Sequence, residues 1–61
     1  MLKYRILARN KNTGYAMIEI DIEAINKAQA LSKCRAEIDT LPGYDNENIN
    51  LVIIGTQVMA C

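Results

Sequence analysis

The sequence predicts an α+β fold with the element order strand, strand, helix, strand (ββαβ). Three features predict it: two runs of alternating apolar and polar residues, a central apolar stripe of helical period, and a later β-branched run. The chain has 61 residues, so we expect a single domain over residues 1–61. A chain of this length has a marginal core and gains stability from further burial against a partner.

The first two strands are predicted at residues 2–9 and 15–24, where apolar and polar side chains alternate with a period of two. The Gly-ended loop between them favours a hairpin. One register pairs apolar residues with each other on one face and sets cations opposite carboxylates on the other, and it places Arg9 opposite Tyr15. It then pairs Leu7 with Met17, Arg5 with Glu19 and Lys3 with Asp21 on one face, and Leu2 with Ile22, Tyr4 with Ile20 and Ile6 with Ile18 on the other.

A helix is predicted at residues 27–39 because its start carries a capping signal. Asn26 is a good cap residue, and Gln29 follows three positions later, as in a capping box. An apolar stripe of helical spacing runs along the segment, and Pro42 stands just beyond its end. The stripe consists of Leu31, Cys34, Ile38 and Leu41, with Ala30 beside it.

The third strand is predicted at residues 48–54, which are apolar on both faces. Gly55 either ends this strand or marks a bulge, and residues 55–61 form a strand extension or a tail. A helix between the second and third strands makes those two strands parallel in direction. The first strand then lies between them, which gives an antiparallel sheet of order 2-1-3 with the helix on one face.

The predicted core lies between the helix and one face of the sheet. It comprises Leu2, Tyr4, Ile6, Ala8, Ala16, Ile18, Ile20, Ile22, Ala30, Leu31, Cys34, Ile38, Leu41, Ile49, Leu51 and Ile53. No further element is left to cover the opposite face, unless residues 55–61 fold back over it. We expect an apolar cluster there, because clustered exposed apolar side chains are typical of an interaction site. Its predicted members are Leu7, Met17, Val52 and Ile54, with Tyr15 and Val58 beside them.

This uncovered face predicts a non-enzymatic module that binds another protein and forms a homodimer. A second copy related by a twofold axis is the simplest partner. The dimer contact is either the helix-free face or the edge of the third strand, which is apolar on both sides.

The alternative function is a small nucleic-acid-binding or regulatory protein. Its contacts would be Lys3, Arg5, Arg9 and Lys11 to phosphates, with Tyr15 stacking on a base. The predicted register sets carboxylates opposite two of these cations, and a neutralised stripe binds phosphates poorly. The net charge of the chain is zero, so we do not expect a nucleic-acid partner.

Composition argues against several other classes of protein. The chain has no histidine and only two cysteines, so we expect no metal, no cofactor and no disulfide framework. Cys34 is predicted to be a buried, inert thiol, whereas Cys61 is predicted to be exposed and open to intermolecular oxidation. We expect no catalytic set, no signal peptide and no membrane span, and therefore a cytoplasmic protein. The element order is generic: it occurs among many small proteins, including accessory proteins carried by phages and plasmids, and it implies no function.

Overall fold

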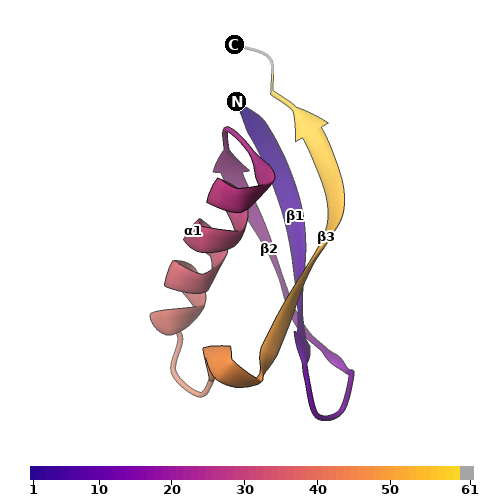
Figure 1. The fold of residues 1–61 in the computed structure, drawn as a ribbon, viewed down its shortest axis with the longest axis vertical. Helices are drawn as coiled ribbons and strands as arrows, with labels where there is room; N and C mark the ends of the chain where they lie inside the picture. The colour runs from indigo at the N-terminus through magenta and orange to yellow at the C-terminus, as the bar shows by residue number, and fades with distance from the viewer. Residues whose placement is uncertain (60–61) are drawn as a thin grey trace.

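A computed structural model describes residues 1–59 of the chain. Its elements are β1 (Leu2–Asn10), β2 (Ala16–Ala24), α1 (Lys27–Asp39), the short 3-10 helix η1 (Asn46–Asn48) and β3 (Ile49–Val58). The strands form one antiparallel sheet of order β2-β1-β3, and α1 lies on one side of it (Figure 1). The predicted ββαβ fold, its strand order and the position of the helix are therefore confirmed.

The hairpin between β1 and β2 closes on Asn10. The N–H of Gly14 donates to the Asn10 carbonyl at 2.8 Å, and the N–H of Asn10 donates to the Tyr15 carbonyl at 2.9 Å. Gly14 and Tyr15 thus both stand opposite Asn10, and Gly14 has a φ of 75°, as in a G1 bulge. The Asn10 side chain fixes the turn by accepting from the N–H groups of Asn12 and Thr13 at 2.8 and 3.1 Å.

The predicted hairpin register is wrong by two residues. The turn sets Tyr15 opposite Asn10, which shifts the register of β2 by one residue. Met17 is an extra residue in a second bulge, and it shifts the register by one more. Arg5 therefore stands opposite Asp21, not Glu19, and Lys3 stands opposite Glu23, not Asp21. A shift of two leaves most side chains on their predicted faces. Ala16 is the exception, because it precedes the Met17 bulge, pairs with Arg9 and is exposed outside the core.

The helix begins and ends at the predicted residues, and its cap explains why. The Asn26 side chain accepts from the N–H of Gln29 at 2.8 Å, and the Gln29 side chain accepts from the N–H of Ile25 at 2.9 Å. The first bond satisfies a backbone donor that a helix start leaves free, and the second ties the residue before the cap to the first turn. The helix lies mainly against β2 and, less closely, against β1.

The core lies between α1 and the sheet. Its buried members are Tyr4, Ile6, Ala8, Ile22, Ala24, Ala30, Cys34, Ile38 and Ile49. Seven partly buried residues pack around them: Leu2, Ile18, Ile20, Leu31, Tyr44, Leu51 and Ile53. Apart from the exposed Ala16 and the half-buried Leu41, the predicted core is confirmed, and Ala24 and Tyr44 add to it.

The third strand is longer than predicted and contains a bulge. Ile53 stands opposite Ile6 and Gly55 opposite Arg5, so Ile54 is the extra residue. Residues 55–58 continue β3, so they do not fold back over the uncovered face. Beyond the bulge the alternation is inverted, and Val58 pairs with Leu2 on the helix side of the sheet. Cys61, which we predicted to be exposed, lies outside the described residues.

Candidate interaction surface

We call the side of the sheet away from α1 the outer face. The central strand, β1, contributes Lys3, Arg5, Leu7 and Arg9 to this face. The residues that lie between them along β1 point to the core. Leu7 stands directly opposite Val52, which is 42% exposed. Met17 and Ile54, the two bulge residues on the flanking strands, are 37% and 47% exposed.

Two of the predicted surface residues lie apart from this group. Tyr15 is 75% exposed at the hairpin end, just before β2 begins. Val58 is 78% exposed at the other end of the sheet, opposite Leu2. The surface is therefore less compact than predicted, since one bulge inverts the phase of β3 and the tight turn leaves Tyr15 outside β2.

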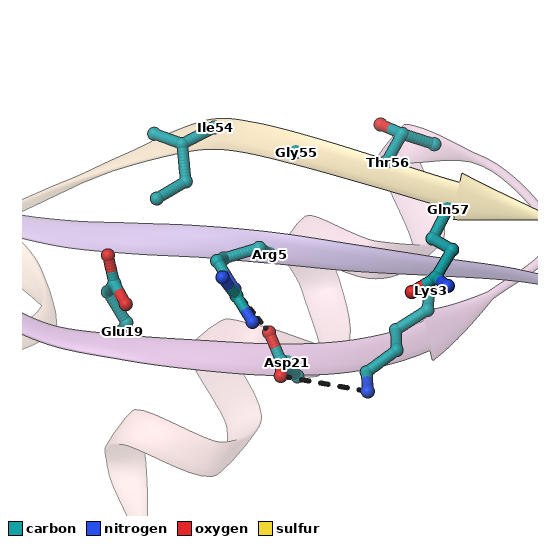
Figure 2. Close-up of a pocket in the computed structure, with 8 residues that line it drawn as sticks. All are labelled: Lys3, Arg5, Glu19, Asp21, Ile54, Gly55, Thr56 and Gln57. Atoms are coloured by element: carbon teal, nitrogen blue, oxygen red, sulfur yellow. Dashed lines mark hydrogen bonds and ion pairs between the residues drawn. The ribbon is translucent and has the colours of Figure 1, made fainter.

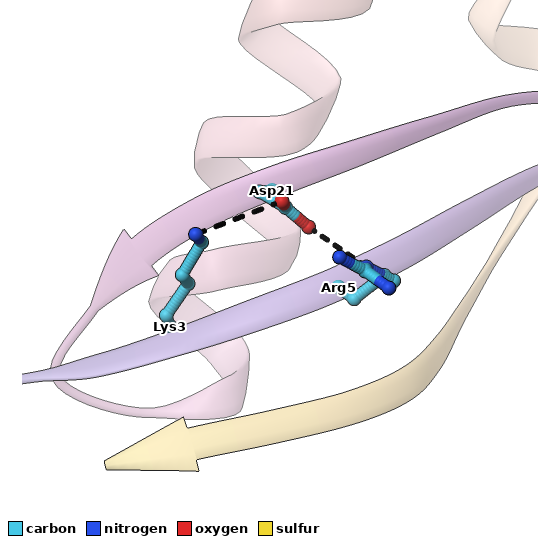
Figure 3. A network of polar contacts seen from close by, with 3 residues as sticks. All are labelled: Lys3, Arg5 and Asp21. Atoms are coloured by element: carbon cyan, nitrogen blue, oxygen red, sulfur yellow. Dashed lines mark hydrogen bonds and ion pairs between the residues drawn. The ribbon is translucent and has the colours of Figure 1, made fainter. Parts of the chain in front are cut away.

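Asp21 joins the two cations at one end of the outer face. Its carboxylate accepts from Nε of Arg5 at 3.2 Å and lies 3.8 Å from Nζ of Lys3 (Figure 3). The hydrogen bond and the charge of Asp21 raise the pKa of Arg5 above its ordinary value. The predicted contact of Lys3 with Asp21 thus exists as a diagonal pair, and Arg5 also bonds Asp21. Both cations are partly neutralised, although exposed pairs of this kind stabilise a fold only slightly.

The other two cations of the predicted nucleic-acid surface lie toward the hairpin. Arg9 stands between Ala16 and Asn50 on the neighbouring strands. Lys11 belongs to the turn, where its backbone N–H donates to the carbonyl of Asn48 at 2.8 Å. The four cations therefore do not form one continuous stripe with Tyr15, because Leu7 separates Arg5 from Arg9 along β1.

A hollow of about 350 Å³ opens on the outer face beside Gly55 (Figure 2). It is lined by Lys3, Arg5, Glu19, Asp21, Ile54, Gly55, Thr56 and Gln57. Gly55 stands opposite Arg5, and a Cβ added to it would meet Cβ of Arg5 at 3.6 Å, an ordinary contact distance. Its φ also lies outside the left-handed region that favours glycine. Neither the backbone nor the packing of the chain therefore requires glycine at this position.

The two edges of the sheet differ in charge. From Ile49 to Val58, β3 contains no charged residue. The opposite edge strand, β2, carries Glu19, Asp21 and Glu23, and Nζ of Lys33 on the helix donates to the carbonyl of Glu23 at 2.9 Å. Charges and a lysine at an edge oppose pairing with another strand. Among the strands that the structure describes, β3 thus combines an open edge with a largely apolar, uncharged sequence.

Other candidate chemistry is sparse in residues 1–59. Cys34 is fully buried, as predicted, and burial raises the pKa of its thiol. Within these residues no three potential ligand side chains come together to hold a metal ion. No helix in the same range has the length and apolar character needed to cross a membrane. No protein-family model, curated protein or solved structure matches the chain.

Proposed function

We propose that this chain is a small, non-enzymatic protein-interaction module that forms a homodimer and acts by binding another macromolecule. The observation that carries the proposal is the uncharged, apolar strand β3 at an open edge of the sheet. The outer face next to it adds Leu7 and Val52 at its centre. Two widely separated cysteines, one of them buried, support a reducing compartment such as the cytoplasm.

An open strand edge has backbone donors and acceptors with no partner in the sheet. Proteins that do not pair through such an edge protect it with charges, proline or a covering element. The sequence of β3 has no charge and no proline. Three of its apolar residues remain substantially exposed, namely Val52 at 42%, Ile54 at 47% and Val58 at 78%. This exposure favours a second strand as the natural neighbour of β3.

The small core gives a second reason to expect a partner. A chain of about 60 residues buries only about 60% of the surface that its unfolded form exposes. Within residues 1–59, the buried residues belong to a single cluster between α1 and the sheet. Burying β3 and the neighbouring apolar side chains against another chain therefore adds stability that the monomer lacks.

Sedimentation at micromolar concentration tests the proposal. We expect the wild type to form dimers and a Val52→Lys, Ile54→Lys variant to be monomeric, because two lysines would enter the contact. The matched control is Ala28→Lys with Ser32→Lys, which adds the same charge to exposed positions of α1 and should leave the dimer intact. A wild type that is strictly monomeric, with a β3 variant of unchanged stability and solubility, would remove the basis of the proposal.

Nucleic-acid binding is less well supported, because Asp21 contacts two of the cations it would use. A chain that binds phosphates should show a shift with short DNA or RNA that weakens steeply with salt. We expect no such shift at low salt. A clear salt-dependent shift that is lost on substitution of Arg9 and Lys11 would favour nucleic-acid binding over the proposed module.

A further inference from the structure

We propose that two copies of this chain pair antiparallel along β3, with Ile54 of each copy opposite Gly55 of the other. Each Ile54 side chain then covers the hollow beside Gly55 of the second copy. This inference rests on the self-association proposed above. It adds the contact surface, the direction and the register.

Gly55 lies in the interior of β3. Glycine in the interior of a strand weakens it and often marks a place where another chain or a ligand approaches closely. Here the backbone has no left-handed φ, and a Cβ would have an ordinary contact at 3.6 Å. The chain itself therefore gives no reason for a glycine. The hollow beside it, about 350 Å³ in volume, has room for a side chain from outside.

The two faces of β3 restrict the register in which two copies can pair. The bulge at Ile54 inverts the alternation, so odd-numbered residues before it and even-numbered residues after it share the helix side. Opposite residues in an antiparallel pair must share a face. Setting Ile54 opposite Gly55 meets this requirement along the strand. It pairs Leu51 with Val58 and Ile53 with Thr56 on the helix side, and Val52 with Gln57 on the outer face.

The occupant of the hollow is a second copy of the chain. Ile54 is 47% exposed and adjoins Gly55 in sequence, so one twofold axis places each side chain at the other copy's hollow. β3 carries no charge, so two copies meet there without like-charge repulsion. Pairing of β3 with β2 of another copy is opposed by the three carboxylates of β2 and by Lys33. The assembly therefore closes as a dimer.

Disulfide trapping tests the register in a Cys61→Ser background. A Val52→Cys chain mixed with a Gln57→Cys chain should yield a linked heterodimer, because directly opposite Cα atoms lie about 4.5–5.5 Å apart and a disulfide spans roughly that distance. Each chain alone should give no link, because identical residues would lie five positions apart, about 17 Å. The background chain, whose remaining thiol is buried, controls for links through Cys34.

A second variant tests the hollow itself. Gly55→Val fills it from the chain's own side, so we expect the dimer dissociation constant to rise on the order of tenfold with the circular dichroism spectrum unchanged. A dimer that links through Leu7→Cys in both copies, and not through residues 52 and 57, overturns the register but leaves the proposed function standing. An unchanged dissociation constant for Gly55→Val likewise overturns the register. A monomeric wild type removes both the register and the proposed homodimer.

Discussion

Replacing Gly55 by alanine should stabilise the isolated chain. Glycine in a strand interior costs roughly 0.5–1 kcal/mol relative to alanine, because its unfolded state has more conformations to lose. The structure allows this gain to appear in full, since the new Cβ would lie 3.6 Å from Cβ of Arg5 and no positive φ is present. For a domain of this size, such a gain raises the melting temperature by about 2–8 °C.

Urea denaturation followed by circular dichroism measures the change. The experiment should be run at a concentration low enough for the chain to be monomeric, because dimerisation would add to the apparent stability. Gly14→Ala is the matched control, since the same substitution there meets a φ of 75°. We expect it to lower the free energy of unfolding by about 1 kcal/mol or more.

The two glycines should therefore respond to the same substitution with opposite signs. If Gly55→Ala destabilises the monomer as Gly14→Ala does, then glycine is required by the chain itself. Position 55 would then not be a place left open for a neighbour. If Gly55→Ala stabilises the monomer, the glycine weakens β3 with no compensating contact inside the chain.

Three further predictions concern the helix and the core. Asn26→Ala removes the cap of α1 and should lower the free energy of unfolding by about 1 kcal/mol in urea titrations, whereas Ala28→Ser on the exposed side should have little effect. Ile38→Val removes one methyl group from a fully buried site and should cost about 0.5–1.5 kcal/mol in the same assay. Burial raises the pKa of the Cys34 thiol in the folded state, so above about pH 8.5 the unfolded chain loses its thiol proton first. The free energy of unfolding should then fall as pH rises from 8 to 10, and it should fall less steeply for a Cys34→Ala variant. Equal pH dependence of the two proteins would contradict a raised thiol pKa at Cys34.

The local signals in the sequence predict the helix well. Asn26 and Gln29 act within one turn of each other, so their spacing alone places the start of α1. Which side chains of β1 and of most of β2 face the core is also predictable, because one face of each strand is strongly apolar. These features are sufficient to derive the fold and its uncovered face.

The register and the bulges are not predictable from the same signals. The sequence of the hairpin loop is compatible with more than one pair of residues at its ends. The side chain of Asn10 and the φ of Gly14 select the turn in which Asn10 stands opposite Tyr15. In β3 both faces are apolar around Ile54, so alternation gives no sign of a change in phase. The hollow at Gly55 depends on both features, because its lining residues come from β3, β1 and β2 as the final register aligns them.

The helix lies mainly against β2 and β1, which leaves β3 attached to the rest of the chain chiefly through its ladder with β1. Beyond Gly55 this strand has exposed side chains on both faces and little packing to hold it. Its backbone amides should consequently open and exchange with solvent at a lower energetic cost than those of the central strand. The segment that we assign to association is thus the one whose order depends most on having a neighbour, so that assembly and local folding of this strand become coupled events.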